Sequence, residues 1–179
     1  MKASDFSAIG LALFMAIGLA QGDTIPGIYC ALPKLRADVA GIEYAETGYT
    51  PWIAVNARNL KVYRWKTEQA ALNGIKKRLK RGYILAVGIA QIKNTNFNAY
   101  HVTLTTALDP CGAARAVSNA IQKNIQWASG AGFGYGHRFA AAASGYTSGK
   151  LQPTNPMVVA YVQRALYARQ LYIKDAYNG

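Results

Sequence analysis

Residues 35–51 read LRADVAGIEYAETGYTP. The apolar side chains of this segment recur at the spacing of one helix face, at Leu35, Val39, Ile42 and Ala45. Gly48 and Pro51 end the predicted helix, because glycine favours a C-terminal cap and proline cannot continue a helix. The segment therefore predicts a helix whose last turn carries Glu46 beside a chain reversal, a position suited to the wall of a cleft.

The next segment predicts a hairpin and a second helix. Residues 52–65 are rich in Trp, Val, Tyr and Leu around a polar centre, and they predict a short β-hairpin. It is the one strand region that we expect. Thr67 is the expected N-cap of the helix that follows, and Gly82 is expected to cap its end.

The remainder of the chain predicts helices joined by loops. Residues 88–100 are expected to begin as a loop and become a short helix, and further helical segments are expected at 103–108, 111–127, 138–144 and 156–173. The last helix is expected to turn one apolar side inward, at Val159, Val162, Leu166 and Tyr167. The predicted fold class is mainly α (α+β), a helical domain with a small β-hairpin.

Composition indicates a folded domain with a strong positive charge. Of the 179 residues, 51% are hydrophobic and only 16% are charged, which is typical of a chain that buries a core. The net charge of +12 favours a polyanionic partner: nucleic acid, anionic lipid or an anionic cell wall. Residues 76–81 carry five of the cations on one predicted helix, where they form a solvated face that also attracts negative surfaces.

The amino-terminal segment is interpreted as an export signal. Residues 9–19 form an apolar run that is too short to span a bilayer comfortably, and cleavage is expected after Ala20. An N-terminal core helix or a retained membrane anchor is the alternative. The expected division is therefore a signal over residues 1–22 and a single domain over 23–179.

Two cysteines, Cys30 and Cys111, lie outside this signal. In an exported protein an even number of cysteines favours a disulfide, whereas two buried free thiols are the other interpretation. A bond between them would close a loop of about eighty residues.

Only eight acids are present, and Glu46 has the most suitable surroundings for acid chemistry. Tyr44, Tyr49 and Trp52 are close to it in the sequence, and an apolar setting raises the pKa of a carboxyl group, as a proton donor requires. Glu43 lies nearly one turn earlier without the following glycine and proline, and we expect it at the solvent or in a surface contact. His101 and His137 form no metal-ligand spacing with the cysteines, so no metal or cofactor is expected.

Two further segments complete a pattern with Glu46. Gly88-Ile89-Ala90-Gln91-Ile92 and Gly145-Tyr146-Thr147-Ser148-Gly149 follow it in this order. Together the three segments resemble the motifs of lytic transglycosylases of the lysozyme-like superfamily, which cleave bacterial peptidoglycan with a single glutamate. The chain departs from the family pattern at Thr47, where serine is more usual, and at Thr147, where asparagine is usual.

This resemblance implies roles for individual residues. Glu46 is the expected catalytic acid, and the expected substrate-binding residues are Thr47, Gln91, Asn96, Tyr146 and Thr147. The Gln91 amide is expected to bind an N-acetyl group or a hydroxyl, and the Tyr146 phenol to bind Glu46 or the substrate. Glu46 would protonate the oxygen between N-acetylmuramic acid and N-acetylglucosamine, then accept the proton of the muramoyl C6 hydroxyl as a 1,6-anhydro ring closes.

The chain is most similar to the subgroup that serves type IV secretion and conjugation. That subgroup has a Cys and a Pro before the catalytic helix, as in Cys30 and Pro33, and an Asp-Pro-Cys later, as in residues 109–111. The similarity implies a Cys30–Cys111 disulfide and a place in the periplasm or cell envelope, or in a virion if a phage encodes it. Ala86 departs from the Asp that the subgroup often has.

The expected partners are peptidoglycan glycan strands and the assembly proteins of a secretion system or virion, with no specific nucleic acid and no stable membrane span. Three alternatives stay open. The same fold could hydrolyse glycan as a muramidase, it could bind the wall as a non-catalytic assembly component, or the basic chain could bind nucleic acid.

Overall fold

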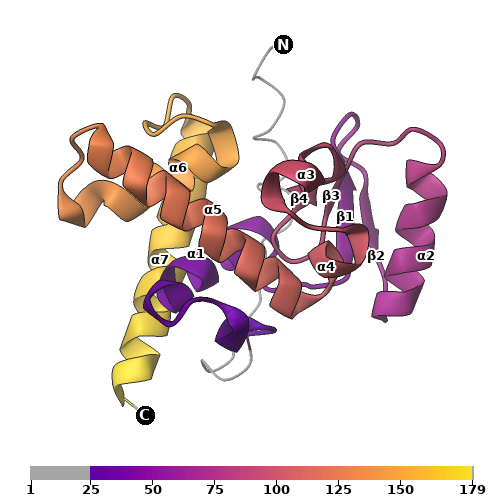
Figure 1. The fold of residues 1–179 in the computed structure, drawn as a ribbon, viewed down its shortest axis with the longest axis horizontal. Coiled ribbons are helices and arrows are strands. Elements are labelled where there is room, and N and C mark those ends of the chain that lie inside the picture. The colour runs from indigo at the N-terminus through magenta and orange to yellow at the C-terminus, as the bar shows by residue number, and fades with distance from the viewer. Residues whose placement is uncertain (1–24, 179) are drawn as a thin grey trace.

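The structure is a computed structural model that describes residues 25–178, so the predicted export signal and its cleavage site at Ala20 lie outside the described residues. Figure 1 shows a helical body beside a small sheet that carries its own helices. The helices of the body are α1 (Arg36–Thr47), α5 (Pro110–Gly130), α6 (Arg138–Ser148) and α7 (Pro156–Asn178). The sheet region adds α2 (Glu68–Leu79), α3 (Phe97–Tyr100) and α4 (Leu104–Leu108). The predicted mainly α, α+β fold is confirmed.

The sheet is antiparallel and has the order β2-β1-β3-β4. Its strands are β1 (Ile53–Asn56), β2 (Val62–Arg64), β3 (Leu85–Val87) and β4 (Ile92–Lys93). The predicted hairpin is confirmed as β1–β2, in which Ala54 pairs with Tyr63. The expectation of a single strand region was wrong, because β3 also pairs with β1 and β4 pairs with β3. Strands of three and two residues are too short to show an alternating pattern.

Local signals place the starts of two helices correctly. The backbone N–H of Ala70 donates to Thr67 Oγ1 at 3.2 Å, so Thr67 caps α2 as expected. Asp109 caps α5 in the same way, since the backbone N–H of Gly112 donates to Asp109 Oδ2 at 2.8 Å. Both α6 and α7 continue beyond their predicted ends, because their closing segments contain no proline and α6 ends only at Gly149.

The buried side of α7 differs from the predicted one. The side chains that face the core are Val158, Tyr161, Val162, Ala165 and Ala168, whereas Val159 is 38% exposed and Tyr167 is 52% exposed. The reason is that α7 packs closely on α1. A Cβ atom at Gly41 of α1 would lie 2.5 Å from the Ala165 carbonyl oxygen, so the backbones meet where both residues are small. The prediction was correct for Val162, which is buried, and for Leu166, which packs against the core, but it wrongly placed Val159 and Tyr167 inward.

A disulfide joins Cys30 to Cys111, which confirms the predicted pairing. Cys30 belongs to the 3₁₀ turn Ile28–Cys30, and Cys111 lies in the first turn of α5. The bond therefore ties the segment before α1 to the start of α5. Among the described residues, no helix is long and apolar enough to cross a membrane.

We predict that the double variant Cys30→Ser with Cys111→Ser unfolds more readily than the wild type. The bond spans a sequence separation of 81 residues, and releasing such a loop lowers the free energy of unfolding by about 2–4 kcal/mol. Urea denaturation at neutral pH measures the change, with dithiothreitol-treated wild type as the parallel sample. An unchanged urea midpoint in both samples would contradict the prediction.

Candidate active site

Glu46 lies in the last turn of α1, as the sequence predicted. The helix ends at Gly48, which has a φ of 59° and whose N–H donates to the Tyr44 carbonyl oxygen at 2.9 Å. A left-handed conformation of this kind is adopted readily by glycine, so the chain reverses immediately after the acid. Glu46 as a whole residue is half-buried.

Tyr161 is the nearest polar partner of Glu46. Tyr161 belongs to α7 and lies 115 residues after Glu46 in the sequence. Its hydroxyl donates a hydrogen bond to Glu46 Oε1 at 2.9 Å. One turn along α7, the guanidinium of Arg164 donates to the Ala45 carbonyl oxygen at 3.5 Å. Sequence reasoning missed both residues, because the predicted apolar side of α7 excluded Tyr161. The only local signal of its place was a tyrosine within the apolar run Val158-Val159-Ala160-Tyr161-Val162.

The surroundings of Glu46 set its proton affinity. Burial raises the pKa of Glu46 to about 7, and the Tyr161 hydrogen bond and the Arg164 charge both oppose this rise because they favour the carboxylate. A carboxyl group with a pKa near 7 is present in both protonation states at neutral pH. It is therefore able to donate a proton in one step and to accept one in the next.

Gln91 lies in the turn between β3 and β4, with a φ of 48°. Its Nε2 donates to the Gly88 carbonyl oxygen at 2.8 Å, which orients the amide. Its Oε1 is buried and has no hydrogen-bond partner among the described residues. A buried acceptor without a partner is costly, so this oxygen is suited to an N–H or O–H group that a ligand brings.

Thr47 holds the end of α1 against this turn. Its hydroxyl donates to the Ile89 carbonyl oxygen at 3.0 Å and accepts a hydrogen bond from the Thr50 N–H at 3.2 Å. The side chain is only 2% exposed. The hydroxyl is thus engaged inside the protein, and we assign Thr47 a positioning role in place of the predicted contact with substrate.

Tyr146 holds the same turn from the other side. Its hydroxyl donates to the Ala90 carbonyl oxygen at 2.9 Å, and not to Glu46 as one form of the prediction had it. The ring meets Tyr100 edge-on, with 6.2 Å between the ring centroids. Thr147 follows it, half-buried in the last turn of α6, and Asn96 is exposed in the turn before α3. Their predicted contacts with substrate stay predictions.

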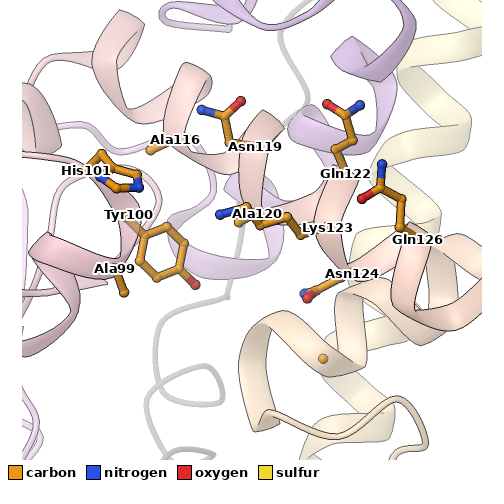
Figure 2. A pocket seen from close by; sticks show the side chains of 11 residues that line it. Ala99, Tyr100, His101, Ala116, Asn119, Ala120, Gln122, Lys123, Asn124 and Gln126 are labelled. Carbon is orange, nitrogen blue, oxygen red and sulfur yellow. The ribbon is translucent and has the colours of Figure 1, made fainter.

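A pocket of about 420 Å³ opens between α3, α5 and α6. Figure 2 shows amide side chains of α5 along one side and Tyr100 of α3 on the other. The polar lining residues are Tyr100, His101, Asn119, Gln122, Lys123, Asn124 and Gln126. Burial, and after it the charge of Glu46, raises the pKa of Tyr100, so this wall lies within the electrostatic reach of the acid.

The lining of this pocket is polar and contains no carboxylate. Amides and hydroxyls are the groups that bind neutral sugars, and sequence reasoning did not identify the α5 amides as part of a site. They lie on one side of a helix that was recognised only by its apolar positions. Within residues 25–178, no group of three or more His, Cys, Asp or Glu side chains is placed to hold a metal.

The structure corrects the expected position of Glu43. The residue was expected at the surface, but it is fully buried and neither carboxyl oxygen has a hydrogen-bond partner. Burial raises the pKa of Glu43 well above its ordinary value, because a carboxylate without partners is poorly stabilised away from water. The physical reason is the central position of α1: residues 38–43 are all buried, so the helix has no solvent side there.

We predict that Glu43→Gln makes stability less dependent on pH. A buried acid with a raised pKa holds its proton more tightly in the folded than in the unfolded chain, so it favours folding below pH 4.5, and this advantage is lost as the pH rises above that value. The thermal midpoint of the variant should therefore rise relative to wild type between pH 4.5 and 8. Glu46 is present in both proteins, so its own contribution to the pH dependence cancels in the difference between them.

Thermal unfolding followed by circular dichroism at several pH values measures this difference. Glu68→Gln, in the first turn of α2, is the matched control for an exchange of Glu for Gln. A difference between Glu43→Gln and wild type that stays constant from pH 4 to 8 would contradict a buried, protonated Glu43.

A second prediction concerns the hydroxyl of Tyr161. Tyr161→Phe removes a donor that favours the Glu46 carboxylate, so the pKa of Glu46 should rise above about 7. Carboxyl ¹³C NMR titration measures it, with Glu46→Gln to assign the resonance. Tyr167→Phe, an exposed tyrosine of the same helix, is the control and should leave the titration unchanged. A fall in the pKa in Tyr161→Phe would contradict the role assigned to the hydrogen bond.

Comparison with known proteins adds no relative to these observations. The chain matches no protein-family model, no curated protein sequence and no solved structure. What the site does therefore has to be inferred from its own residues and their geometry.

Proposed function

We propose that this protein is a peptidoglycan lytic transglycosylase with Glu46 as its single catalytic residue. The observation that carries the proposal is the state of this acid: it is half-buried, its pKa is about 7, and its charge reaches Tyr100, which lines a pocket together with the amide side chains of α5. Such an acid is suited to a reaction that needs a proton donor first and a proton acceptor afterwards. The order of the three sequence motifs supports the same family.

The proposed reaction uses each of these properties. Protonated Glu46 donates its proton to the oxygen that joins N-acetylmuramic acid to N-acetylglucosamine, and the bond from that oxygen to C1 breaks. The Glu46 carboxylate then accepts the proton of the muramoyl C6 hydroxyl, whose oxygen bonds to C1. The products are a free N-acetylglucosamine hydroxyl and a 1,6-anhydro end, no water is consumed, and Glu46 recovers its proton.

The surrounding residues support binding of a glycan strand. The unpartnered Oε1 of Gln91 is suited to accept the N–H of an N-acetyl group. The amides of α5 and the Tyr100 hydroxyl supply further donors and acceptors along the pocket. Thr47 and Tyr146 keep the Gln91 turn in place through the Ile89 and Ala90 carbonyl oxygens, so they act through Gln91.

Hydrolysis of glycan, as by a muramidase, is the second candidate function, and it requires a second carboxylate in the site. An inverting hydrolase needs a second carboxylate that activates water, and a retaining one needs a carboxylate nucleophile. The carboxylate of Asp109 accepts the Gly112 N–H as the N-cap of α5. Glu43 is fully buried beneath the acid. These placements favour the reaction with one acid.

The biological use that we propose is local opening of the wall for a secretion, conjugation or pilus machine, or for a phage. The disulfide is typical of proteins that reach an oxidising compartment, so it supports export to the periplasm or cell envelope, or a place in a virion. Glycan strands are the proposed substrate, and assembly proteins of such a machine are the proposed partners.

We expect the protein to release 1,6-anhydromuropeptides from purified peptidoglycan, and Glu46→Gln to release at least about 10²-fold less, because the amide cannot donate a catalytic proton. Mass spectrometry of the digests identifies the products. Glu68→Gln is the matched control and should keep wild-type activity.

Two results would overturn the proposal in different ways. Products with reducing ends that disappear in Glu46→Gln would keep the catalytic residue but make the protein a muramidase. No release by a folded wild type, together with binding of glycan strands, would make it a wall-binding assembly component.

A further inference from the structure

A second pocket lies far from Glu46, between the edge strand β2 and helix α2. It has a volume of about 260 Å³, and its lining residues are Lys61, Tyr63, Lys77, Arg78, Arg81 and Tyr83. Figure 1 places α2 and β2 at the end of the molecule that faces away from α5, α6 and α7. It shares no lining residue with the pocket between α3, α5 and α6.

The charge of this pocket has one sign. Four of its six lining residues are cationic and none is acidic. Residues 58–81 around it hold nine Lys or Arg against a single acid, Glu68, so they carry most of the chain's net charge of +12. None of the four lining cations has a carboxylate within ion-pair distance among the described residues. Cations gathered without counter-charges repel one another, and an anion would relieve this repulsion.

Arg78, one of the lining residues, is held in a fixed orientation. Its Nη1 donates to the Gly74 carbonyl oxygen at 2.8 Å, and its guanidinium carbon lies 3.9 Å from the centroid of the Tyr63 ring. The remaining N–H groups of the guanidinium are not used by any residue that the structure describes. An orientated guanidinium with free donors is preorganised to bind two oxygens of one anion.

Two aromatic residues of the region, Tyr63 and Trp65, are engaged by the protein itself, which leaves Tyr83 as the other aromatic residue of the lining. Arg78 covers one side of Tyr63, and Trp65 packs against the backbone of α2, where a Cβ atom at Gly74 would lie 2.7 Å from its ring. Binding of nucleobases depends on open aromatic rings on which the bases stack. The pocket therefore favours the phosphate group itself over a nucleobase.

We propose that the pocket between β2 and α2 is a phosphate-binding site. It takes a phosphomonoester or phosphodiester group, which is supplied either by a soluble phosphate compound or by the headgroup of an anionic lipid. Arg78 binds two phosphate oxygens as a fork, and Lys61, Lys77 and Arg81 neutralise the remaining charge from the rim. This site is independent of the proposed cleavage of glycan, and its test needs no glycan.

Two double variants with the same loss of charge test the site. Lys77→Gln with Arg81→Gln removes two cations of the rim, and Arg115→Gln with Lys150→Gln removes two exposed cations elsewhere. Inorganic phosphate is titrated into ¹⁵N-labelled protein, with sodium chloride adjusted to keep the ionic strength constant. We expect saturable shifts of the amides of β2 and α2, with at least a tenfold weaker affinity in the pocket variant and an unchanged affinity in the control variant.

Arg78→Lys tests the fork without removing charge. It should weaken phosphate binding several-fold, because an ammonium group contacts an anion as a point and not as a fork. The thermal midpoint of each variant shows that it is folded. Equal weakening in both double variants, or shifts that do not saturate, would overturn the proposal and leave only a general effect of net charge.

Vesicles distinguish the two sources of phosphate. Sedimentation with vesicles of phosphatidylcholine containing 30% phosphatidylglycerol, against vesicles of phosphatidylcholine alone, measures lipid binding. A loss in the pocket variant that the control variant does not share identifies a lipid headgroup, whereas equal sedimentation of both variants identifies a soluble phosphate compound. Binding of single-stranded oligonucleotide that phosphate does not compete with, but that the pocket variant loses, would overturn the proposal in favour of a nucleic-acid site.

Discussion

The close packing of α1 on α7 is the contact from which the rest of the site follows. At Gly41 and Ala165 the two helix backbones nearly touch, and this distance brings Tyr161 within 2.9 Å of Glu46. Burial around the end of α1 desolvates the acid and raises its pKa to about 7. A wider spacing would leave Glu46 an ordinary surface carboxylate, so the proposed chemistry depends on two small residues that take no part in it.

Hydrogen bonds connect the three sequence motifs in the folded protein. Thr47 of the first motif donates to the Ile89 carbonyl oxygen, and Tyr146 of the third donates to the Ala90 carbonyl oxygen. Both partners are neighbouring residues of the second motif. Side chains from two helices thus hold one turn in which Gln91 has a left-handed backbone and a buried oxygen without a partner. Holding the turn in this way is a physical reason for a hydroxyl at position 47 and a phenol at position 146.

The two pockets differ in charge. The pocket between α3, α5 and α6 is lined mainly by amides and small residues with one lysine, Lys123, whereas four of the six lining residues of the pocket between β2 and α2 are cations. A glycan site and a phosphate site in these two pockets would let the protein bind its proposed substrate while another part engages an anionic group. The excess of positive charge in the composition therefore has a definite location, which its total value does not reveal.

Several features could be inferred from the sequence because they depend on neighbours in the chain. The helix ending at Gly48, the position of Glu46 in its last turn, the Thr67 cap and the β1–β2 hairpin all follow from local rules of capping and periodicity. Tyr161, the buried Glu43 and the strands β3 and β4 could not be inferred in this way. Each depends on contacts with distant parts of the chain. Tyr161 reaches Glu46 because α7 packs on α1, Glu43 is buried in the interior of the fold, and β3 forms a strand because it pairs with β1 and β4. Side-chain periodicity records which positions are apolar, but it does not record how closely two backbones approach, and that distance places the partners of Glu46.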